Sequence, residues 1–412
     1  MGQKAAGLDF GTTKIAALIG DVDEESNSNT KIVGVGKAPP EGLDGSRLSN
    51  PRKAASEVRK ALGQAQEMAS TEIDFLYAGI GPSQLTRREA SGTVSIRRRK
   101  SIIDQEDVER CLEVAKPDRL PRGQRVIEIT PLQFSVDGQQ GITNPVGMKG
   151  RRLDVKLSIF ACPENVARNL ISCIKSAELQ LSRLVPKPVA SAEAVLTPME
   201  KKQGVIMMDI GGGNTDVAVF QRNHIRTVYS VPLGGKHITN DLSACLNTTL
   251  ENAERIKLSE PLLKDQPQGK FLLPEEIEVQ DTSENRIKIA RSQLKDITAA
   301  RLEEIFEMSF QAVRESGLKN PTSLRLVLTG GGSLLEDLPA FVENEYGLQV
   351  RIASGSANVE GLTDVVQNPI YTTAIGLINY GIKRRRKLPS PFSHPLNQAV
   401  SNVERWLKDL FG

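Results

Sequence analysis

The chain has 412 residues, with a hydrophobic fraction of 39%, a charged fraction of 25% and a formal net charge of +3. This length favours two or more domains over a single core. The composition is typical of a soluble globular protein, and so small a charge gives no indication of nucleic-acid binding. The cysteines form no CxxC pair and the histidines are scattered, which argues against a metal site or disulfide framework and fits a reducing cytoplasm. No apolar run reaches membrane-spanning length.

The first part of the chain predicts a strand-rich unit that is interrupted by a second unit. Strand patterns at 5–20 and 31–37 precede a helix at 51–70, in which apolar residues recur at helix spacing. A buried strand follows from Phe75, and the pattern then changes between residues 85 and 162. This change predicts a small inserted α+β module. Its expected elements are a strand near 92–96, a helix at 104–115 and a long hairpin of 125–136 with 153–162.

The remainder of the chain predicts a return to the first unit, a second domain and a tail. A helix at 163–177 and a strand at 181–186 complete the first unit. The elements expected next are a strand–turn–strand unit at 205–220, helices near 235–258 and 285–316, a strand with a Gly-rich turn at 324–332, and closing pieces at 346–352 and 371–382. Residues 383–396 are basic and then rich in Pro and Ser, which predicts a loose linker.

One strand–turn–strand motif occurs twice, roughly 200 residues apart. Gly7-Leu-Asp-Phe-Gly-Thr-Thr-Lys reappears in altered form as Met208-Asp-Ile-Gly-Gly-Gly-Asn-Thr. Such a turn presents backbone N–H groups and hydroxyls to one anion, and its Asp can hold hydrated Mg²⁺ beside phosphates. Either copy alone is compatible with an ordinary Gly-rich turn. Two facing copies predict a site that holds a nucleotide polyphosphate from both sides.

A third Gly-rich element follows a strand near the end of the second domain. Leu324-Arg-Leu-Val-Leu-Thr-Gly-Gly-Gly-Ser predicts a strand, a turn and the start of a helix, where glycines leave room for a flat base or ribose. By itself it also fits a tight strand–helix connection. Ala253-Glu-Arg-Ile-Lys by itself fits a plain solvated helix turn.

In chain order, these segments resemble the actin-like ATPase fold shared by MreB, sugar kinases and the heat-shock chaperones. The resemblance implies an α/β fold of two domains, with duplicated β-sheet cores flanked by helices around ATP and Mg²⁺. It implies that Asp9 and Asp209 orient the metal through water, that the two turns hold the phosphates, that the 253–257 helix reaches the ribose or base, and that the third turn lies beneath the adenine. The residues implied in nucleotide binding are Asp9, Gly11, Thr12, Thr13, Lys14, Asp209, Gly211, Gly212, Gly213, Asn214, Glu254, Lys257, Gly330, Gly331, Gly332 and Ser333.

The segment that discriminates best between members of this fold lies in the inserted module. Gly141-Ile-Thr-Asn-Pro-Val-Gly-Met-Lys-Gly resembles the Ile-x-Asn-Pro-x-Gly-Met/Leu-x-Gly signature of the FtsA family of bacterial cell-division proteins, although its composition alone describes a Pro/Gly loop. The insert also lies where that family carries its extra subdomain. The implied division of the chain is domain 1 at 1–84 and 163–190, an insert at 85–162, domain 2 at 191–365 with a helical subdomain at about 240–310, a closing segment at 366–382, a linker at 383–396 and an amphipathic membrane-targeting helix at 397–412.

The tail has an apolar stripe at helix spacing, opposite a charged face. A closing helix packed on the protein body would show the same pattern. The loose linker and the preceding basic run favour a helix that lies on an anionic membrane surface. One short helix binds reversibly, so stable attachment needs several tails on one assembly. The residues of the stripe are Val400, Val403, Trp406, Leu407, Leu410 and Phe411.

The resemblance also implies partners and a location. FtsA-like proteins polymerise along the cytoplasmic face of the membrane at the division septum, recruit later division proteins and bind the C-terminal peptide of FtsZ. Arg301, within 291–308, falls on the family's basic position for that acidic peptide. A solvated helix surface is the alternative for Arg301. The basic run Arg97–Lys100 is expected to be a solvated loop rather than a subunit or lipid contact.

The position of the expected catalytic side chain predicts slow or absent ATP hydrolysis. In actin and MreB a Gln or Glu after the strand that leads into the second domain positions the attacking water. Lys187 stands at about this place, and Glu193 is expected in the following helix. A cation cannot accept a proton from water.

Two alternative functions remain for a protein of this fold. One is a small-molecule kinase, which has no use for an amphipathic tail. The other is a pilus-assembly adaptor, against which the Asn144-Pro145 string argues.

Overall fold

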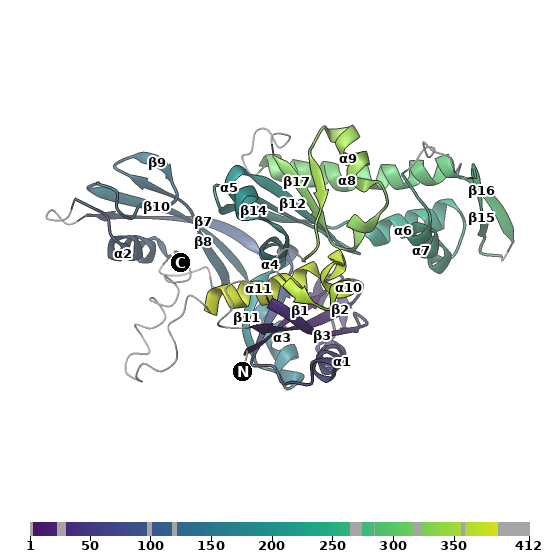
Figure 1. Ribbon diagram of the computed structural model, residues 1–412, viewed down its shortest axis with the longest axis horizontal. Helices are drawn as coiled ribbons and strands as arrows, with labels where there is room; N and C mark the ends of the chain where they lie inside the picture. Colours follow the sequence, from purple (N-terminus) through teal and green to yellow (C-terminus); the bar gives the residue numbers. More distant parts are fainter. Residues whose placement is uncertain are drawn as a thin grey trace.

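The computed structural model describes residues 3–22, 30–96, 101–117, 122–263, 274–283, 285–315, 324–355 and 359–385. The predicted tail helix, the run Arg97–Lys100 and the predicted linker beyond residue 385 lie outside these ranges. Among the helices that are described, none is long and apolar enough to cross a bilayer. Two large sheets flank a pair of central helices, and a third sheet extends from one end of the molecule (Figure 1).

The first sheet has six strands in the order β11-β6-β1-β2-β3-β19. Helices α1 and α3 cover one of its faces and enclose an apolar core. The predicted helix at 51–70 is confirmed as α1. It begins at Pro51 because the Asn50 side chain accepts the Lys53 N–H and proline suits the first turn. The bounds are β1 (Gln3–Phe10), β2 (Ile15–Val22), β3 (Thr30–Ala38), β6 (Phe75–Ile80), β11 (Leu181–Pro186), β19 (Val359–Gly361), α1 (Pro51–Ala69), α3 (Glu164–Ser176), and the small β4 (Leu43–Asp44) and β5 (Arg47–Leu48).

The second sheet has five strands in the order β14-β13-β12-β17-β18. Helices α6, α8 and α9 pack on one face, and α7 with the hairpin β15-β16 extends this helical part away from the sheet (Figure 1). The bounds are β12 (Val205–Ile210), β13 (Thr215–Gln221), β14 (His224–Val231), β15 (Glu276–Gln280), β16 (Arg286–Ala290), β17 (Arg325–Thr329), β18 (Val350–Ile352), α5 (Pro198–Gln203), α6 (Gly235–Cys245), α7 (Leu250–Ser259), α8 (Arg291–Glu315), α9 (Leu338–Tyr346) and α10 (Thr363–Val366).

Helices α4 (Lys187–Val195) and α11 (Thr372–Arg385) join the two sheets. Their residues share one apolar core with both sheets, which includes Val189 and Ile378 in the helices and Leu18 and Met207 in the strands. A close approach requires glycine here, because a Cβ on Gly376 of α11 would lie 1.8 Å from the Ala190 carbonyl oxygen of α4. The two halves of the molecule therefore contact through a packed helix pair, and the cleft opens beside it.

The insert is a four-stranded antiparallel sheet, β7-β10-β8-β9, with helix α2 on one face. It is joined to α11 by a buried carboxylate: Glu128 of β8 is 3% exposed, accepts the Tyr380 hydroxyl at 2.5 Å and pairs with Arg384 at 2.9 Å. Arg183 of β11 lies 3.6 Å from the same carboxylate. The bounds are β7 (Thr86–Ser95), α2 (Gln105–Ala115), β8 (Gln124–Val136), β9 (Gln139–Ile142) and β10 (Arg152–Pro163).

Two expectations about element bounds are wrong. The helix predicted over 285–316 begins at Arg291, because Arg286–Ala290 pairs with Glu276–Gln280 as a β-hairpin. The predicted helical subdomain at about 240–310 therefore also contains strands. Residues 383–385, predicted to belong to a linker, are the end of α11, which continues to Arg385. The last turn of α11 is held by ion pairs from Lys383 to Glu193 at 3.1 Å and from Arg384 to Glu128.

Candidate functional site

The two Asp–Gly motifs form hairpins of the same geometry. In the first, Asp9 pairs with Ala16 across β1 and β2, and the Gly11 N–H donates to the Lys14 carbonyl at 3.0 Å. In the second, Asp209 pairs with Asp216 across β12 and β13, and the corresponding bond, from Gly211 to Asn214, is 2.9 Å long. A Cβ on Gly11 would lie 2.6 Å from the Lys14 carbonyl oxygen, so glycine is required at this turn.

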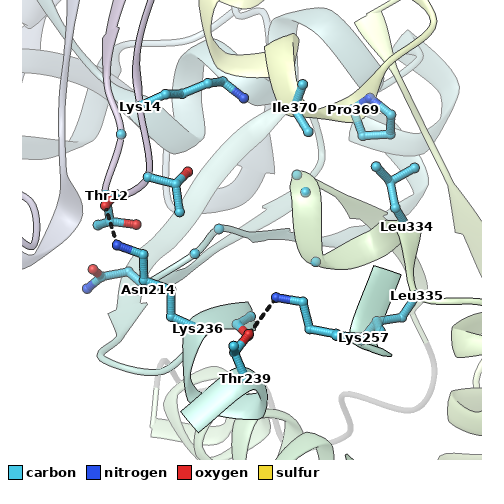
Figure 2. Close-up of a pocket in the computed structure, with 18 of the residues that line it drawn as sticks. Thr12, Lys14, Asn214, Lys236, Thr239, Lys257, Leu334, Leu335, Pro369 and Ile370 are labelled. Atoms are coloured by element: carbon cyan, nitrogen blue, oxygen red, sulfur yellow. Dashed lines mark hydrogen bonds between the residues drawn. The ribbon is translucent and has the colours of Figure 1, made fainter. Parts of the chain in front are cut away.

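The two hairpins face each other and are in direct contact at one end of the cavity that both line. The backbone N–H of Gly213 donates to the Thr12 hydroxyl at 2.7 Å, and the Lys236 ammonium donates to the Thr12 carbonyl at 2.9 Å. Figure 2 shows Thr12, Asn214 and Lys236 together at this end of the cavity. Gly213 thus contacts the opposite hairpin and is absent from the lining of the cavity. Lys236 is a lining residue that the sequence analysis missed.

The third Gly-rich turn lies against the second hairpin. Gly330 has a φ of +82°, and a Cβ there would lie 2.3 Å from Asp209 Oδ1, so only glycine fits. Gly330, Gly331 and Gly332 line the cavity. Ser333 was predicted beneath the adenine, yet it is buried and its hydroxyl donates to the Gly330 carbonyl at 2.7 Å. The Ser333 side chain therefore stabilises the turn through this hydrogen bond and does not line the cavity.

Glu254 and Lys257 lie one turn apart on α7 and form part of a polar cluster with α6. The Lys257 ammonium lies 2.6 Å from Glu254 Oε2, 2.8 Å from the Thr239 hydroxyl and 3.1 Å from the Gly235 carbonyl. Thr239 also donates to Glu254. Figure 2 shows the Lys257–Thr239 bond at the cavity wall. These contacts fix both charged side chains at the edge of the cavity.

All three glycine turns and α7 open onto one cavity of about 1110 Å³. Its acidic end contains Asp9, Asp209 and Asp216, and its opposite wall is apolar. Leu334, Leu335, Pro369 and Ile370 form that wall (Figure 2). Leu334 is 53% exposed and so offers apolar surface to the cavity. A cavity with hydrogen-bond donors and charges at one end and an exposed apolar wall at the other suits a nucleotide.

The apolar wall was not predicted. Leu334 and Leu335 directly follow the Gly-rich turn, and their position in the chain was a signal that the sequence analysis left unused. Pro369 and Ile370 come from the segment that precedes α11, and nothing local in the sequence indicates that they face the third turn. Gly331 lies against this segment, since its Cβ would be 3.4 Å from Ile370.

The acidic end of the cavity carries unbalanced charge. Asp209 Oδ2 accepts the hydroxyls of Ser191 at 2.8 Å and Thr373 at 3.1 Å, but burial raises the pKa of Asp209 above its usual value. Burial likewise raises the pKa of Asp216 to about 7, although it accepts the Ser230 hydroxyl at 2.6 Å. A cation beside these two carboxylates would therefore stabilise their charged forms.

The donor set fits a magnesium ion that is held mainly by water and phosphate. Within the part of the chain that the structure describes, no three His, Cys, Asp or Glu side chains are grouped so as to hold a metal alone. Asp9 and Asp209 approach the same end of the cavity from opposite hairpins. Mg²⁺ usually keeps several waters and binds one or two carboxylates together with substrate phosphates. These two residues would supply that share of its coordination.

Lys187, which stands about where the water-positioning side chain is expected, and Glu193 lie in different surroundings. Lys187, the first residue of α4, lines the cavity and lies 2.8 Å from Asp9 Oδ1. Glu193 is in α4, as expected, but is absent from the cavity lining and pairs with Lys201 at 2.9 Å and Lys383 at 3.1 Å. Burial raises the pKa of Glu193, and the two lysines more than offset this, which leaves the pKa lowered.

Arg301 lies on α8, away from the cavity. Its guanidinium forms two hydrogen bonds to Asp241 of α6, of 2.6 and 2.9 Å, and also pairs with Glu304. The hydrogen bonds to Asp241 raise the pKa of Arg301 further above its usual value. The side chain is 23% exposed. The structure thus places the predicted peptide-binding residue on a helical face of the second domain, already paired with an acid.

The paired sheets, the two facing Asp–Gly hairpins and the cavity between them define the actin-like ATPase fold. Solved structures agree with the fold: a PilM–PilN type IV pilus biogenesis complex has a TM-score of 0.60 at 18% identity over 92% of this chain and 98% of that chain. MreB 5 of Spiroplasma citri bound to AMPPNP has a TM-score of 0.53 at 12% identity over 91% of this chain and 94% of that one.

Sequence relatives identify the family. The cell division protein FtsA of Pseudomonas aeruginosa is 32% identical over 100% of this chain and 99% of that protein, and FtsA of Escherichia coli K12 is 31% identical over 98% and 97%. A family model for cell division protein FtsA matches residues 206–376, and one for the SHS2 domain inserted in FtsA matches residues 83–161. The chain therefore belongs to the FtsA family of cell division proteins.

Proposed function

We propose that the protein binds ATP with Mg²⁺ in this cavity and polymerises, and that it ties FtsZ filaments to the cytoplasmic face of the membrane at the division septum, where it recruits later division proteins. The observation that carries the proposal is the cavity itself, with two facing Asp–Gly hairpins at one end and an apolar wall at the other. Membership of the FtsA family supports the role in division.

Each end of the cavity has its own task in binding ATP. The turns at Gly11 and Gly211 present backbone N–H groups and hydroxyls to the phosphates, and the Lys14 ammonium adds positive charge. Burial lowers the pKa of Lys14, which favours a site where an anion compensates the buried charge. The base lies against Leu334 and Ile370 and the ribose against α7. Bound Mg²⁺ would neutralise phosphate charge beside Asp9 and Asp209.

Hydrolysis is expected to be slow or absent. A water-positioning base must lie within hydrogen-bond reach of the attacking water. Lys187 lies at the phosphate end as an ammonium and has no lone pair to accept a proton. Glu193 does not line the cavity. Tight binding with little turnover suits a protein whose task is assembly rather than catalysis.

The FtsZ peptide is proposed to bind on the α8 face around Arg301. An acidic peptide would replace Asp241 or Glu304 as the partner of the guanidinium, a bidentate geometry that arginine forms with carboxylates. The Arg301–Asp241 pair therefore competes with the peptide, so a stronger pair lowers the affinity for the peptide.

Opposite changes in affinity are expected from the two residues of this pair. Arg301→Ala should weaken binding of the FtsZ C-terminal peptide at least about tenfold, as loss of an arginine anchor does at other interfaces. Asp241→Asn should strengthen binding, because it removes the charge that competes for Arg301. Fluorescence anisotropy of a labelled peptide measures both. Equal affinities for the wild type and Arg301→Ala would place the peptide elsewhere.

The tail at 397–412 is proposed to insert its apolar stripe into anionic membrane. Trp406 is the single tryptophan of the chain, so its emission reports on the tail alone. Anionic vesicles added to the purified protein should shift this emission to the blue, because the indole enters a less polar region, whereas Trp406→Phe removes the signal as a control. An emission that is blue before vesicles are added, and insensitive to them, would mean that the tail packs on the protein body.

A further inference from the structure

One buried lysine lies at the acidic end of the cavity. The Lys187 ammonium is 2.8 Å from Asp9 Oδ1 and donates to the Phe10 carbonyl at 2.5 Å, and the side chain is only 12% exposed. Both partners belong to the end of β1, immediately before the first phosphate turn. A cation of the protein itself is therefore fixed beside one of the two carboxylates that would face the metal.

The surroundings hold this ammonium in place. The lysine stem passes over Gly79 of β6, where a Cβ would lie 3.0 Å from Lys187 Cγ and 3.7 Å from Asp9 Oδ1. A side chain at Gly79 would push the lysine off its path. The backbone of Lys187 is fixed as well, since it is the first residue of α4 and follows Pro186 at the end of β11.

The charged groups at this end are the three acids together with Lys187 and Lys14. Burial lowers the pKa of Lys187, but the attraction of Asp9, Asp216 and Asp209 more than offsets this and leaves the pKa raised. The Lys187 ammonium lies among these carboxylates, 2.8 Å from Asp9 Oδ1. It partly compensates the carboxylates that would otherwise repel the phosphates of a nucleotide.

We propose that Lys187 is a specificity-determining residue that acts as a resident cation, so that the site binds a nucleoside triphosphate with little dependence on Mg²⁺. The inference rests on the proposed nucleotide site and adds to it. Where a metal alone balances the negative charge of Asp9, Asp209 and Asp216, the site loses the nucleotide when the metal is removed. In this site the Lys187 ammonium remains, 2.8 Å from Asp9 Oδ1, and Lys14 also lines the cavity.

The test is the affinity for ATP, by titration calorimetry, in Mg²⁺ and in excess EDTA. The wild type should lose less than about tenfold in affinity on removal of Mg²⁺, whereas Lys187→Met should lose at least about 100-fold, since a unit charge at this range has a large effect in a partly buried site. Lys187→Arg, which keeps the charge, should behave more like the wild type.

Lys201→Met is the matched control. It removes a lysine of similar exposure from an ion pair of similar length, to Glu193 at 2.9 Å, outside the cavity. It should keep the wild-type response to EDTA. A wild type that binds ATP in Mg²⁺ and loses it by 100-fold or more in EDTA would overturn this inference alone. A wild type that does not bind in Mg²⁺ either would overturn the proposed nucleotide site and this inference with it.

Discussion

Replacing Asp209 with asparagine is expected to weaken Mg-ATP binding by up to about tenfold, the lower end of the effect of losing a group that orients a bound metal through its ligands. The amide keeps the shape of the side chain and an oxygen that accepts the hydroxyls of Ser191 and Thr373. It removes the charge that would hold the water shell of Mg²⁺. Titration calorimetry in Mg²⁺ measures the loss.

The same substitution is expected to leave the fold at least as stable. Burial raises the folded-state pKa of Asp209, so the charged form costs stability once the pH exceeds its unfolded value. A neutral amide avoids that cost at pH 7, and the thermal midpoint should stay equal or rise. Asp107→Asn, which removes another buried carboxylate from the N-terminus of α2, should leave ATP binding unchanged. Unfolding of the Asp209 variant would mean that this carboxylate has a structural role.

Replacing Glu128 with alanine is expected to lower the free energy of unfolding by about 3–5 kcal/mol, the cost of breaking a buried ion pair from one side. Glu128 is the shared partner of Arg183, Arg384 and the Tyr380 hydroxyl. Burial raises the pKa of Tyr380 well above its usual value, so its hydroxyl remains a donor to this carboxylate. Without Glu128, two partly buried arginines lose this counter-charge.

A surface pair in the same insert is the control for Glu128. Glu89→Ala in β7 removes a glutamate that is 54% exposed and pairs with Arg87 at 2.7 Å. Such an exposed pair contributes less than about 1 kcal/mol. Chemical denaturation of both variants compares the two sites. Equal losses would show that Glu128 contributes no more than a surface pair to holding the insert and the end of α11 together.

The parts of the site that local chemistry determines were predictable from the sequence. A strand that ends in Asp before a Gly-rich turn is encoded in consecutive residues, and both hairpins at Asp9 and Asp209 form as expected. The turn at Gly330 is of the same kind, because its φ and its close approach to Asp209 exclude other residues. The resemblance to the actin-like ATPase fold added the expectation that these turns surround one nucleotide.

The parts that depend on contacts between distant segments were not predictable. Ile370 reaches the cavity only because α11 packs between the two sheets. The carboxylate pairing of Arg301 depends on the packing of α6 against α8, which no local pattern reports. Strand β16 was missed although Arg286-Ile-Lys-Ile-Ala alternates, because the helical pattern that follows it masked a five-residue strand whose partner lies across a turn.

Titration calorimetry of Mg-ATP into the purified protein is the most direct test of the central claim, that the cavity between the two hairpins is a nucleotide site. We expect saturable binding of one nucleotide per chain, which is weakened when Asp9 and Asp209 are both changed to alanine. No heat of binding at any accessible ATP concentration, or a double variant that binds as the parent does, would contradict the claim.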